Sequence, residues 1–380
     1  MRVGVCIFNQ NFGDWDRFEA AERGESVPSV PAVPDDQIFR EELAFAIEAD
    51  RLGYDTIWTI EHHFTPYGME SNPLQYLSYM AGVTERVDLG TMVVVLPWHN
   101  PVRVAEDINM LQLFLGNDRK VIAGVGRGLA RREFQGLGID QNESRSRFDE
   151  SLLIVRDLLR DGHISFHGEH FNIDNVFLRP QPARDLSSQL WCAAGSPPTL
   201  EIQAKYGISP LIIPNTNLET ALHGVERYMD LRREHGFGQT HTKLSIYIYV
   251  AETEEEAREG IEYLHNYAMS VARHYELLAD YHKDLKGYEH YGNMAQAMEG
   301  RADMYKAMFE EQPWGTPDKV LAEISRLGEA FGASEVMGVF RFGGMPLEKA
   351  QKSLRLFAKE VLPHIQGVDF EPLTLTDAGS

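Results

Sequence analysis

The sequence has few of the features that mark secreted or membrane proteins. Its 380 residues contain only two cysteines, Cys6 and Cys192, each within an apolar run, which excludes a disulfide scaffold. No apolar stretch approaches the length of a membrane span, and the apolar start Met1–Phe8 is too short for the core of a signal peptide. We therefore expect a cytoplasmic protein with no membrane partner.

Basic residues are also scarce. The chain has 36 Lys and Arg residues against 57 Asp and Glu residues, so its formal net charge is −21. Proteins that bind nucleic acids or anionic membrane surfaces need a basic surface. The charge balance therefore argues against both kinds of partner, and its simplest consequence is solubility.

What the sequence does contain is a regular alternation of apolar, β-branched segments with amphipathic segments. Strands are predicted at residues 3–8, 54–60, 87–96, 120–125, 189–194, 208–213, 244–251 and 335–340. Helices are predicted at residues 37–52, 73–85, 102–115, 144–160, 199–206, 218–235, 317–331 and 347–364, with another beginning after Thr253. Nearly continuous apolar strands are typical of a parallel sheet buried on both faces. Eight strands, each followed by a helix, predict the α/β fold of a (β/α)8 TIM barrel.

One barrel domain over residues 1–380 needs insertions at three places. Residues 9–36 form a long polar loop, and residues 162–188 contain two short aromatic runs that predict a hairpin-like excursion. Residues 267–313 include a polar segment rich in Tyr and His. The competing doubly wound fold would need a nucleotide-binding fingerprint in its first turn, which Phe8–Gly13 does not supply.

The chemistry of a TIM barrel lies at the carboxyl ends of its strands. Glu61, His62 and His63 lie where the second strand emerges into a loop. Imidazole titrates near neutral pH and often acts as a general acid or base, although a single histidine also serves often in packing. Because side chains alternate along a strand, we expect only one of the two histidines to enter a common pocket.

Later strand ends carry groups that suit an anion. After the fourth strand, Gly124-Val-Gly126 would let the backbone approach a ligand, and Arg127 offers a fork that matches phosphate. A tight turn with solvated arginines is the alternative interpretation. After the fifth strand, residues 194–199 open a helix, whose free N–H groups and hydroxyls favour an anion. Together with Arg145, these groups predict a phosphate-bearing cofactor.

Two other barrel chemistries fit less well. A glycosidase needs two carboxylates that face one another at strand ends, but the fourth strand ends in Gly-Val-Gly-Arg. A metal hydrolase needs several inward ligands, but His62 and His63 are adjacent and no His-x-His pair occurs, so no metal is expected. From the residues alone, the chain is a barrel enzyme with a phosphate-bearing ligand and a histidine in its pocket.

A series of short motifs between Gly53 and Gly207 also matches a known family in order and spacing. They are Glu61-His-His-Phe-Thr65, Gly68, Asn72-Pro73, Val87-Asp-Leu-Gly-Thr91, Val95-Leu-Pro97, Pro101-Val-Arg103, Glu106-Asp-Ile-Asn109, Arg127-Gly-Leu129, Phe134, Gly138, Asp140, Asn142, Ser144-Arg145, Ser196 and Thr199. With these motifs the chain resembles the bacterial luciferase-like flavin-dependent monooxygenases, in particular the luciferase α subunit.

The resemblance implies reduced flavin mononucleotide (FMNH2) as the cofactor. The positions that match the family's cofactor site are Thr91, Met92, Val93, Arg127, Arg145, Gly195, Ser196 and Thr199. Among them, Arg127, Arg145, Ser196 and Thr199 would hold the phosphate. The Met92–Val93 position matches an unusual non-prolyl cis peptide bond under the isoalloxazine ring. His62 matches the catalytic histidine, with acid or base chemistry as its role.

The implied activity is that of a monooxygenase that uses O2 through a flavin peroxide to hydroxylate a small organic substrate or to oxidise it in a Baeyer-Villiger reaction. Gly126 stands where luciferase has a reactive cysteine, so light emission is not implied. Because the chain has no nicotinamide fingerprint, reduced flavin would come from a separate NAD(P)H:flavin reductase. A homodimer is expected.

Two alternatives within the resemblance stay open. One is a deazaflavin-dependent oxidoreductase of the same superfamily, and the other is a non-catalytic partner subunit like the luciferase β chain. Residues 267–313 match the position of the luciferase mobile loop, so we expect them to act as a lid that trypsin cleaves early near Lys283 or Lys286.

Overall fold

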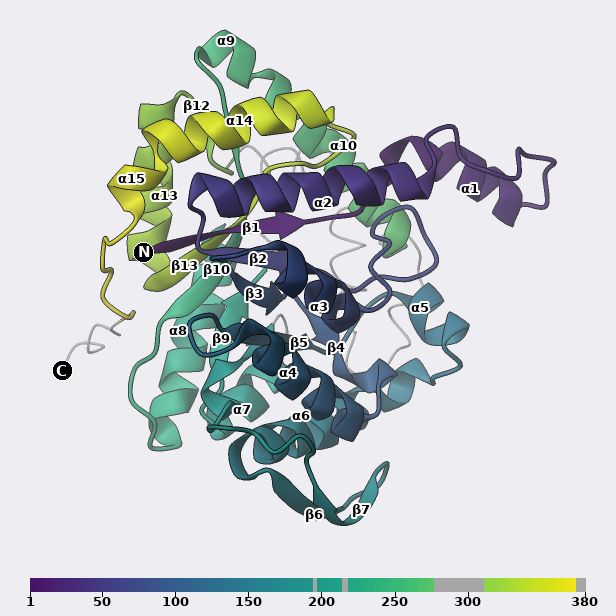
Figure 1. Cartoon of the computed structure of the whole chain (residues 1–380), viewed down its shortest axis with the longest axis vertical. Coiled ribbons are helices and arrows are strands. Elements are labelled where there is room, and N and C mark those ends of the chain that lie inside the picture. Colours follow the sequence, from purple (N-terminus) through teal and green to yellow (C-terminus); the bar gives the residue numbers. More distant parts are fainter. Residues whose placement is uncertain (194–196, 214–217, 277–310, 374–380) are drawn as a thin grey trace.

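Parallel strands close into a barrel in the computed structural model, which describes residues 1–193, 197–213, 218–276 and 311–373 (Figure 1). The barrel strands are β1 (Arg2–Ile7), β2 (Thr56–Thr59), β3 (Asp88–Thr91), β5 (Val121–Gly126), β8 (Leu190–Ala193), β9 (Ser209–Ile212), β10 (Thr242–Tyr247) and β13 (Ala333–Val339). Strand β1 pairs with β2 on one side and with β13 on the other, so that Val5 lies opposite both Ile57 and Gly338. Parallel pairings between the other neighbours complete the ring. The predicted (β/α)8 TIM barrel is confirmed.

Helices cover the outside of this ring. The longer ones are α2 (Asp35–Leu52), α3 (Pro73–Val83), α4 (Pro101–Leu115), α6 (Ser144–Asp161), α7 (Pro197–Lys205), α8 (Leu218–Glu234), α10 (Glu259–His274), α13 (Pro317–Phe331) and α14 (Leu347–Glu360). Shorter elements are η1 (Phe12–Asp14), α1 (Trp15–Glu22), η2 (Leu96–Trp98), α5 (Arg131–Gly136), η3 (Gln141–Glu143), η4 (Ser187–Gln189), α9 (Glu254–Ala257) and α15 (Leu362–Ile365). None of the helices within the described ranges is long and apolar enough to cross a membrane.

Local sequence explains where individual helices begin and end. Helix α3 begins after Asn72, whose side chain accepts a hydrogen bond from the Gln75 N–H at 3.0 Å, and Pro73 occupies the first turn, where it loses no helical hydrogen bond. Helix α2 ends at Gly53, which has a φ of 93°. Phe45 and Ala49 of α2 are fully buried, so one face of this helix packs onto the barrel.

A buried group of charges lies at the amino-terminal end of the barrel. The Glu335 carboxylate is fully buried, and it accepts hydrogen bonds from the Lys243 ammonium at 2.5 Å and from Trp58 Nε1 at 2.9 Å. Burial alone would raise the pKa of Glu335, but the charges of Lys243 and Arg2 bring the pKa below its usual value. This end of a TIM barrel serves stability, so the chemistry should be sought at the opposite rim.

Two predicted elements differ from the structure. The predicted loop 9–36 contains η1 and helix α1. Acidic side chains of α1 form ion pairs with other elements, such as Glu22 with Arg132 of α5. The predicted strand 87–96 is two strands, β3 and β4 (Val94–Val95), because the chain turns at Met92–Val93. A propensity pattern does not report such a break, since after Asp88 every residue in this run is apolar or β-branched.

The structure describes the second predicted insertion in full and the third in part. The hairpin-like excursion is confirmed as β6 (His163–His167) paired antiparallel with β7 (Asn172–Phe177). After β10 the chain forms β11 (Tyr249–Val250), which pairs with β12 (Trp314–Gly315). Helix α10 continues to His274, so the start of the insertion predicted at residue 267 is helical. Most of the predicted lid, including Lys283 and Lys286, lies outside the described residues.

Candidate active site

The loop that follows β2 carries His62 and His63 at the carboxyl end of the barrel. Strand β2 ends at Thr59, whose carbonyl accepts a hydrogen bond from the Met92 N–H at 2.7 Å. Farther along, the His62 N–H donates to the Glu70 carbonyl at 3.2 Å. Contacts with the segment after β1 hold the same loop, for example the Met69 N–H with the Asn9 carbonyl at 3.2 Å. The histidines are therefore placed by a fixed backbone.

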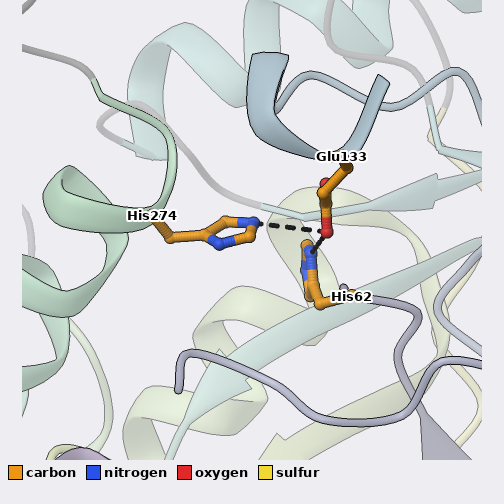
Figure 2. Close-up of side chains that lie close together, drawn as sticks. All are labelled: His62, Glu133 and His274. Atoms are coloured by element: carbon orange, nitrogen blue, oxygen red, sulfur yellow. Dashed lines mark hydrogen bonds and ion pairs between the residues drawn. The ribbon is translucent and has the colours of Figure 1, made fainter. Parts of the chain in front are cut away.

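Figure 2 shows His62 and His274 beside one another, with both rings directed at the same carboxylate oxygen of Glu133. His62 Nδ1 lies 3.0 Å and His274 Nε2 lies 3.5 Å from Glu133 Oε1. The His63 backbone N–H donates to the same oxygen at 2.8 Å. These groups come from the loop after β2, from α5 and from α10, so the barrel brings together residues separated by more than 200 positions. His274 is 0% exposed and Glu133 is 1% exposed.

Burial and mutual charge shift the pKa values of this group. Burial alone would raise the pKa of Glu133, but the neighbouring His62 and His274 bring it well below its usual value. Burial is the largest influence on His274 and lowers its pKa to about 4, although Glu133 acts in the opposite direction. At neutral pH, Glu133 is therefore ionised and His274 is neutral.

Tyrosines surround the two imidazoles. The Tyr275 hydroxyl lies 3.3 Å from His62 Nε2, and the Tyr67 ring stacks on the His274 ring with centroids 4.7 Å apart. The Tyr67 and Tyr267 hydroxyls are 2.5 Å apart. Burial raises the pKa of Tyr67 above its usual value, so its hydroxyl stays protonated. The surroundings of His62 are thus aromatic, with a few hydroxyl groups.

A second buried carboxylate holds the other histidine. Glu61 Oε1 lies 2.6 Å from His99 Nε2 and 3.3 Å from His63 Nε2, while Oε2 accepts a hydrogen bond from the Val95 N–H at 2.6 Å. Burial would raise the pKa of Glu61, but the hydrogen bonds with His63 and His99 lower it overall. Burial would lower the pKa of His99, but Glu61 raises it overall. The adjacent histidines therefore contact different carboxylates.

The structure brings two of the predicted phosphate-binding residues together. Arg145, in the first turn of α6, donates through Nη2 to the Thr199 hydroxyl in the first turn of α7 at 2.9 Å. Arg127 directly follows β5 and is 8% exposed. Burial raises the pKa of the Asp149 carboxyl, and the nearby charges of both arginines offset part of this rise. Gly195 and Ser196 lie outside the described residues.

The predicted positions Thr91, Met92 and Val93 form a turn between β3 and β4. The Met92–Val93 peptide bond is cis, which confirms the bond that the resemblance implied. The Thr91 hydroxyl donates to the Gly124 carbonyl at 2.7 Å. A Cβ atom at Gly124 would collide with the Thr91 backbone, and one at Gly126 would meet the Val93 side chain.

Gly124 and Gly126 lie within β5, and they let this strand pack closely against the Met92–Val93 turn. The alternative interpretation of a tight turn with solvated arginines was wrong at these positions, because the strand continues to Gly126 and Arg127 is buried. The approach of a ligand to these glycines stays a prediction.

The same atoms beside His62 also match a transition-metal ligand set. His62 Nδ1, Glu133 Oε1 and His274 Nε2 lie within 4.8 Å of one another. The sequence-based reasoning against a metal considered only His62 and His63 and missed His274. The absence of a metal stays a prediction.

Sequence reasoning missed three residues of this site. Glu133 was visible only as one acidic residue in the segment after the fourth strand. His274 and Tyr275 gave no signal, because a whole helix separates them from the seventh strand. Only the packing of α10 over the barrel brings them to His62.

Lowering the pH from about 6.5 to about 4 should destabilise the protein through His274. In this range the unfolded chain binds a proton at His274 and the folded chain does not, so the free energy of unfolding falls by up to about 1.4 kcal/mol per pH unit. Urea unfolding at several pH values should show a smaller slope for His274→Asn than for the parent. A variant of the exposed His364, His364→Asn, should keep the parent's slope. Equal slopes for all three proteins would contradict the assignment.

Comparisons with known proteins agree with this geometry. The family model for luciferase-like monooxygenases matches residues 1–335 of the chain. The alkanal monooxygenase alpha chain of Photorhabdus luminescens is 27% identical over 331 residues, which cover 84% of this chain and 89% of that protein. The monooxygenase RslO1 from Streptomyces bottropensis is 25% identical and superposes with a TM-score of 0.69, over 96% of this chain and 99% of that one.

Two more distant structures share the fold and differ in cofactor. The oxygenating constituent of 3,6-diketocamphane monooxygenase from Pseudomonas putida, a type II Baeyer-Villiger enzyme in complex with FMN, is 20% identical with a TM-score of 0.68, over 96% of this chain and 98% of that one. An F420-dependent secondary alcohol dehydrogenase is 17% identical with a TM-score of 0.67, over 96% of this chain and 99% of that one. The closed barrel, the site at its carboxyl rim and the family match together identify the chain as an enzyme of the luciferase-like monooxygenase family.

Proposed function

We propose that the chain is the oxygenase component of a two-component flavin monooxygenase. It would take up reduced FMN from a separate NAD(P)H:flavin reductase and use O2 to hydroxylate a small organic substrate or to oxidise it in a Baeyer-Villiger reaction. The observation that carries the proposal is the group Arg127, Arg145 and Thr199 at the same rim as the Met92–Val93 turn and His62. When bound, reduced FMN would supply the electrons that activate O2.

The chemistry of the donors fits the phosphate of FMN. Arg145 and the Thr199 hydroxyl are already in contact, and both lie in the first turns of helices, where free N–H groups favour an anion. Guanidinium groups match phosphate oxygens in pairs, which a lysine does not. Gly195 and Ser196 would complete this set of donors. Thr91, Met92 and Val93 would support the ring system from the neighbouring strand.

His62 is the residue that we assign to proton transfer. Its side chain is 13% exposed, and its Nε2 faces the aromatic space beside Tyr275. A buried carboxylate that contacts its Nδ1 is the arrangement found for a general base in many enzymes. This support for His62 favours a catalytic chain over the alternative of a non-catalytic partner subunit.

The exposed apolar residues of α3 and α4 support a homodimer. Four large apolar side chains are exposed on these helices, which pack against each other: Tyr79 (57%), Met110 (40%), Leu113 (44%) and Phe114 (57%). An apolar patch of this kind marks a protein–protein contact. Light scattering should give the mass of a dimer for the parent and of a monomer for Phe114→Glu. Phe177→Glu, which changes an equally exposed residue of the β6–β7 hairpin, should stay dimeric; a monomeric parent would contradict the proposal.

Arg145→Ala should weaken the binding of reduced FMN by roughly 10- to 150-fold, because it removes a charge-assisted contact with phosphate that contributes about 1.5–3 kcal/mol. An anaerobic titration followed by flavin fluorescence measures this. Arg147→Ala is the matched control, because Arg147 lies in the same turn of α6 and forms an ion pair with Glu143. Equal affinities for the parent and Arg145→Ala would place the phosphate elsewhere.

The proposed reaction is tested by mixing the anaerobic complex with oxygenated buffer. We expect the bound flavin to be reoxidised more slowly than free reduced FMN, because a closed site excludes water. The purified chain should not oxidise NADH unless a flavin reductase and FMN are added. Reduced F420 is titrated in parallel, and tighter binding of F420 than of FMN would replace the proposal by the deazaflavin alternative.

A further inference from the structure

The Glu133 carboxylate contacts both the His62 ring and the backbone N–H of the adjacent His63. Its Oε1 lies 3.0 Å from His62 Nδ1 and accepts a hydrogen bond from the His63 N–H at 2.8 Å. Glu133 therefore fixes both the rotation of the His62 ring and the path of the chain behind it. Its own helix, α5, is held from outside by the ion pairs of Arg131 with Glu276 at 2.6 Å and of Arg132 with Glu22.

The protonation state of Glu133 decides which nitrogen of His62 carries a proton. An ionised carboxylate has no hydrogen to donate and can only accept. The Nδ1 atom, 3.0 Å from this carboxylate, must therefore carry the hydrogen. In a neutral imidazole the other nitrogen, Nε2, is then an acceptor. The hydroxyl of Tyr275 lies 3.3 Å from Nε2 and donates to it.

His274 supports the negative charge of Glu133 at the same carboxylate oxygen that contacts His62. The Tyr67 N–H donates to the Thr65 hydroxyl oxygen at 3.3 Å, and this hydroxyl lies 2.8 Å from His274 Nδ1. If the hydroxyl donates to Nδ1, the ring hydrogen is on Nε2, which faces Glu133 Oε1 at 3.5 Å. Three N–H groups then surround one carboxylate oxygen, which explains how a buried carboxylate stays ionised.

We propose that Glu133 is a positioning residue that holds His62 in the tautomer with a proton on Nδ1 and an unprotonated acceptor at Nε2. His274 and Thr65 keep the carboxylate in place for this task. The inference rests on the proposed function for its chemical meaning, because His62 transfers the proton there. Glu133 itself acts only through His62.

The tautomer is measured without any cofactor. In protein labelled with 15N at histidine, the two ring nitrogens of His62 have different shifts according to which one carries hydrogen, and the His62→Gln variant assigns the signals. At a pH where His62 is neutral, the parent should carry hydrogen on Nδ1. In Glu133→Leu, no acceptor faces Nδ1, so the hydrogen is no longer held there and the Nε2–H tautomer should gain population. Glu133→Asp keeps a carboxylate and should retain the parent's tautomer.

Turnover gives the second readout. Glu133→Leu should lower kcat by about a hundredfold or more, as expected when a general base is no longer held in the right tautomer, while reduced FMN binds as in the parent. Glu133→Asp should recover part of the loss. Glu61→Gln is the matched control, because Glu61 is an equally buried carboxylate that contacts His63 and His99; the tautomer of His62 should not change in this variant.

Three results would overturn the inference. They are hydrogen on Nε2 of His62 in the parent, unchanged His62 shifts in Glu133→Leu, and one equivalent of zinc or iron in the purified protein, because a metal on Nδ1 would replace the proton. The outcome is independent of the proposed function. A parent with hydrogen on Nδ1 that fails to bind reduced FMN would contradict the function alone, and flavin chemistry with hydrogen on Nε2 would contradict the positioning role alone.

Discussion

Closure of the parallel sheet is the constraint on which the other features of this protein depend. Because β1 pairs with both β2 and β13, each barrel strand has a neighbour on both sides, and its backbone groups are paired within the ring. All strands then run in the same direction, so that all their carboxyl ends meet at one rim. Loops and helices that start there bring His62, Glu133 and His274 into contact although they are far apart in the sequence.

Burial of charge follows from this closure, because the ends of the ring are covered by packed side chains. A buried carboxylate costs free energy unless positive or donor groups surround it. At the amino-terminal end, Glu335 is surrounded by Lys243, Arg2 and Trp58, which are permanent donors. At the carboxyl rim, Glu61 and Glu133 each contact two imidazoles. Donors around a buried carboxylate thus give a stable cluster of charges at the amino-terminal end and a cluster suited to proton transfer at the carboxyl rim.

The two rim carboxylates differ in what they hold. Glu61 connects His63 and His99 with the Val95 N–H, and so with the turn at Met92–Val93, which we propose to contact the cofactor. Glu133 connects His62 with α5 and α10. Because His62 and His63 are neighbours in the chain, the backbone joins the two groups.

The sequence by itself determined the barrel, because the order of buried strands and amphipathic helices is a property of local composition. It also determined the positions of His62, Arg145 and Thr199 at strand and helix ends, and the resemblance named the cis bond at Met92–Val93, which the structure contains. Their roles with FMN stay predictions. Only the tertiary structure decided that Gly124 and Gly126 make room for a neighbouring strand and that residues 15–22 form a helix. It also decided that Glu133, His274 and Tyr275 meet His62, because contacts between residues so distant in the chain depend on how the helices pack, which local patterns do not encode.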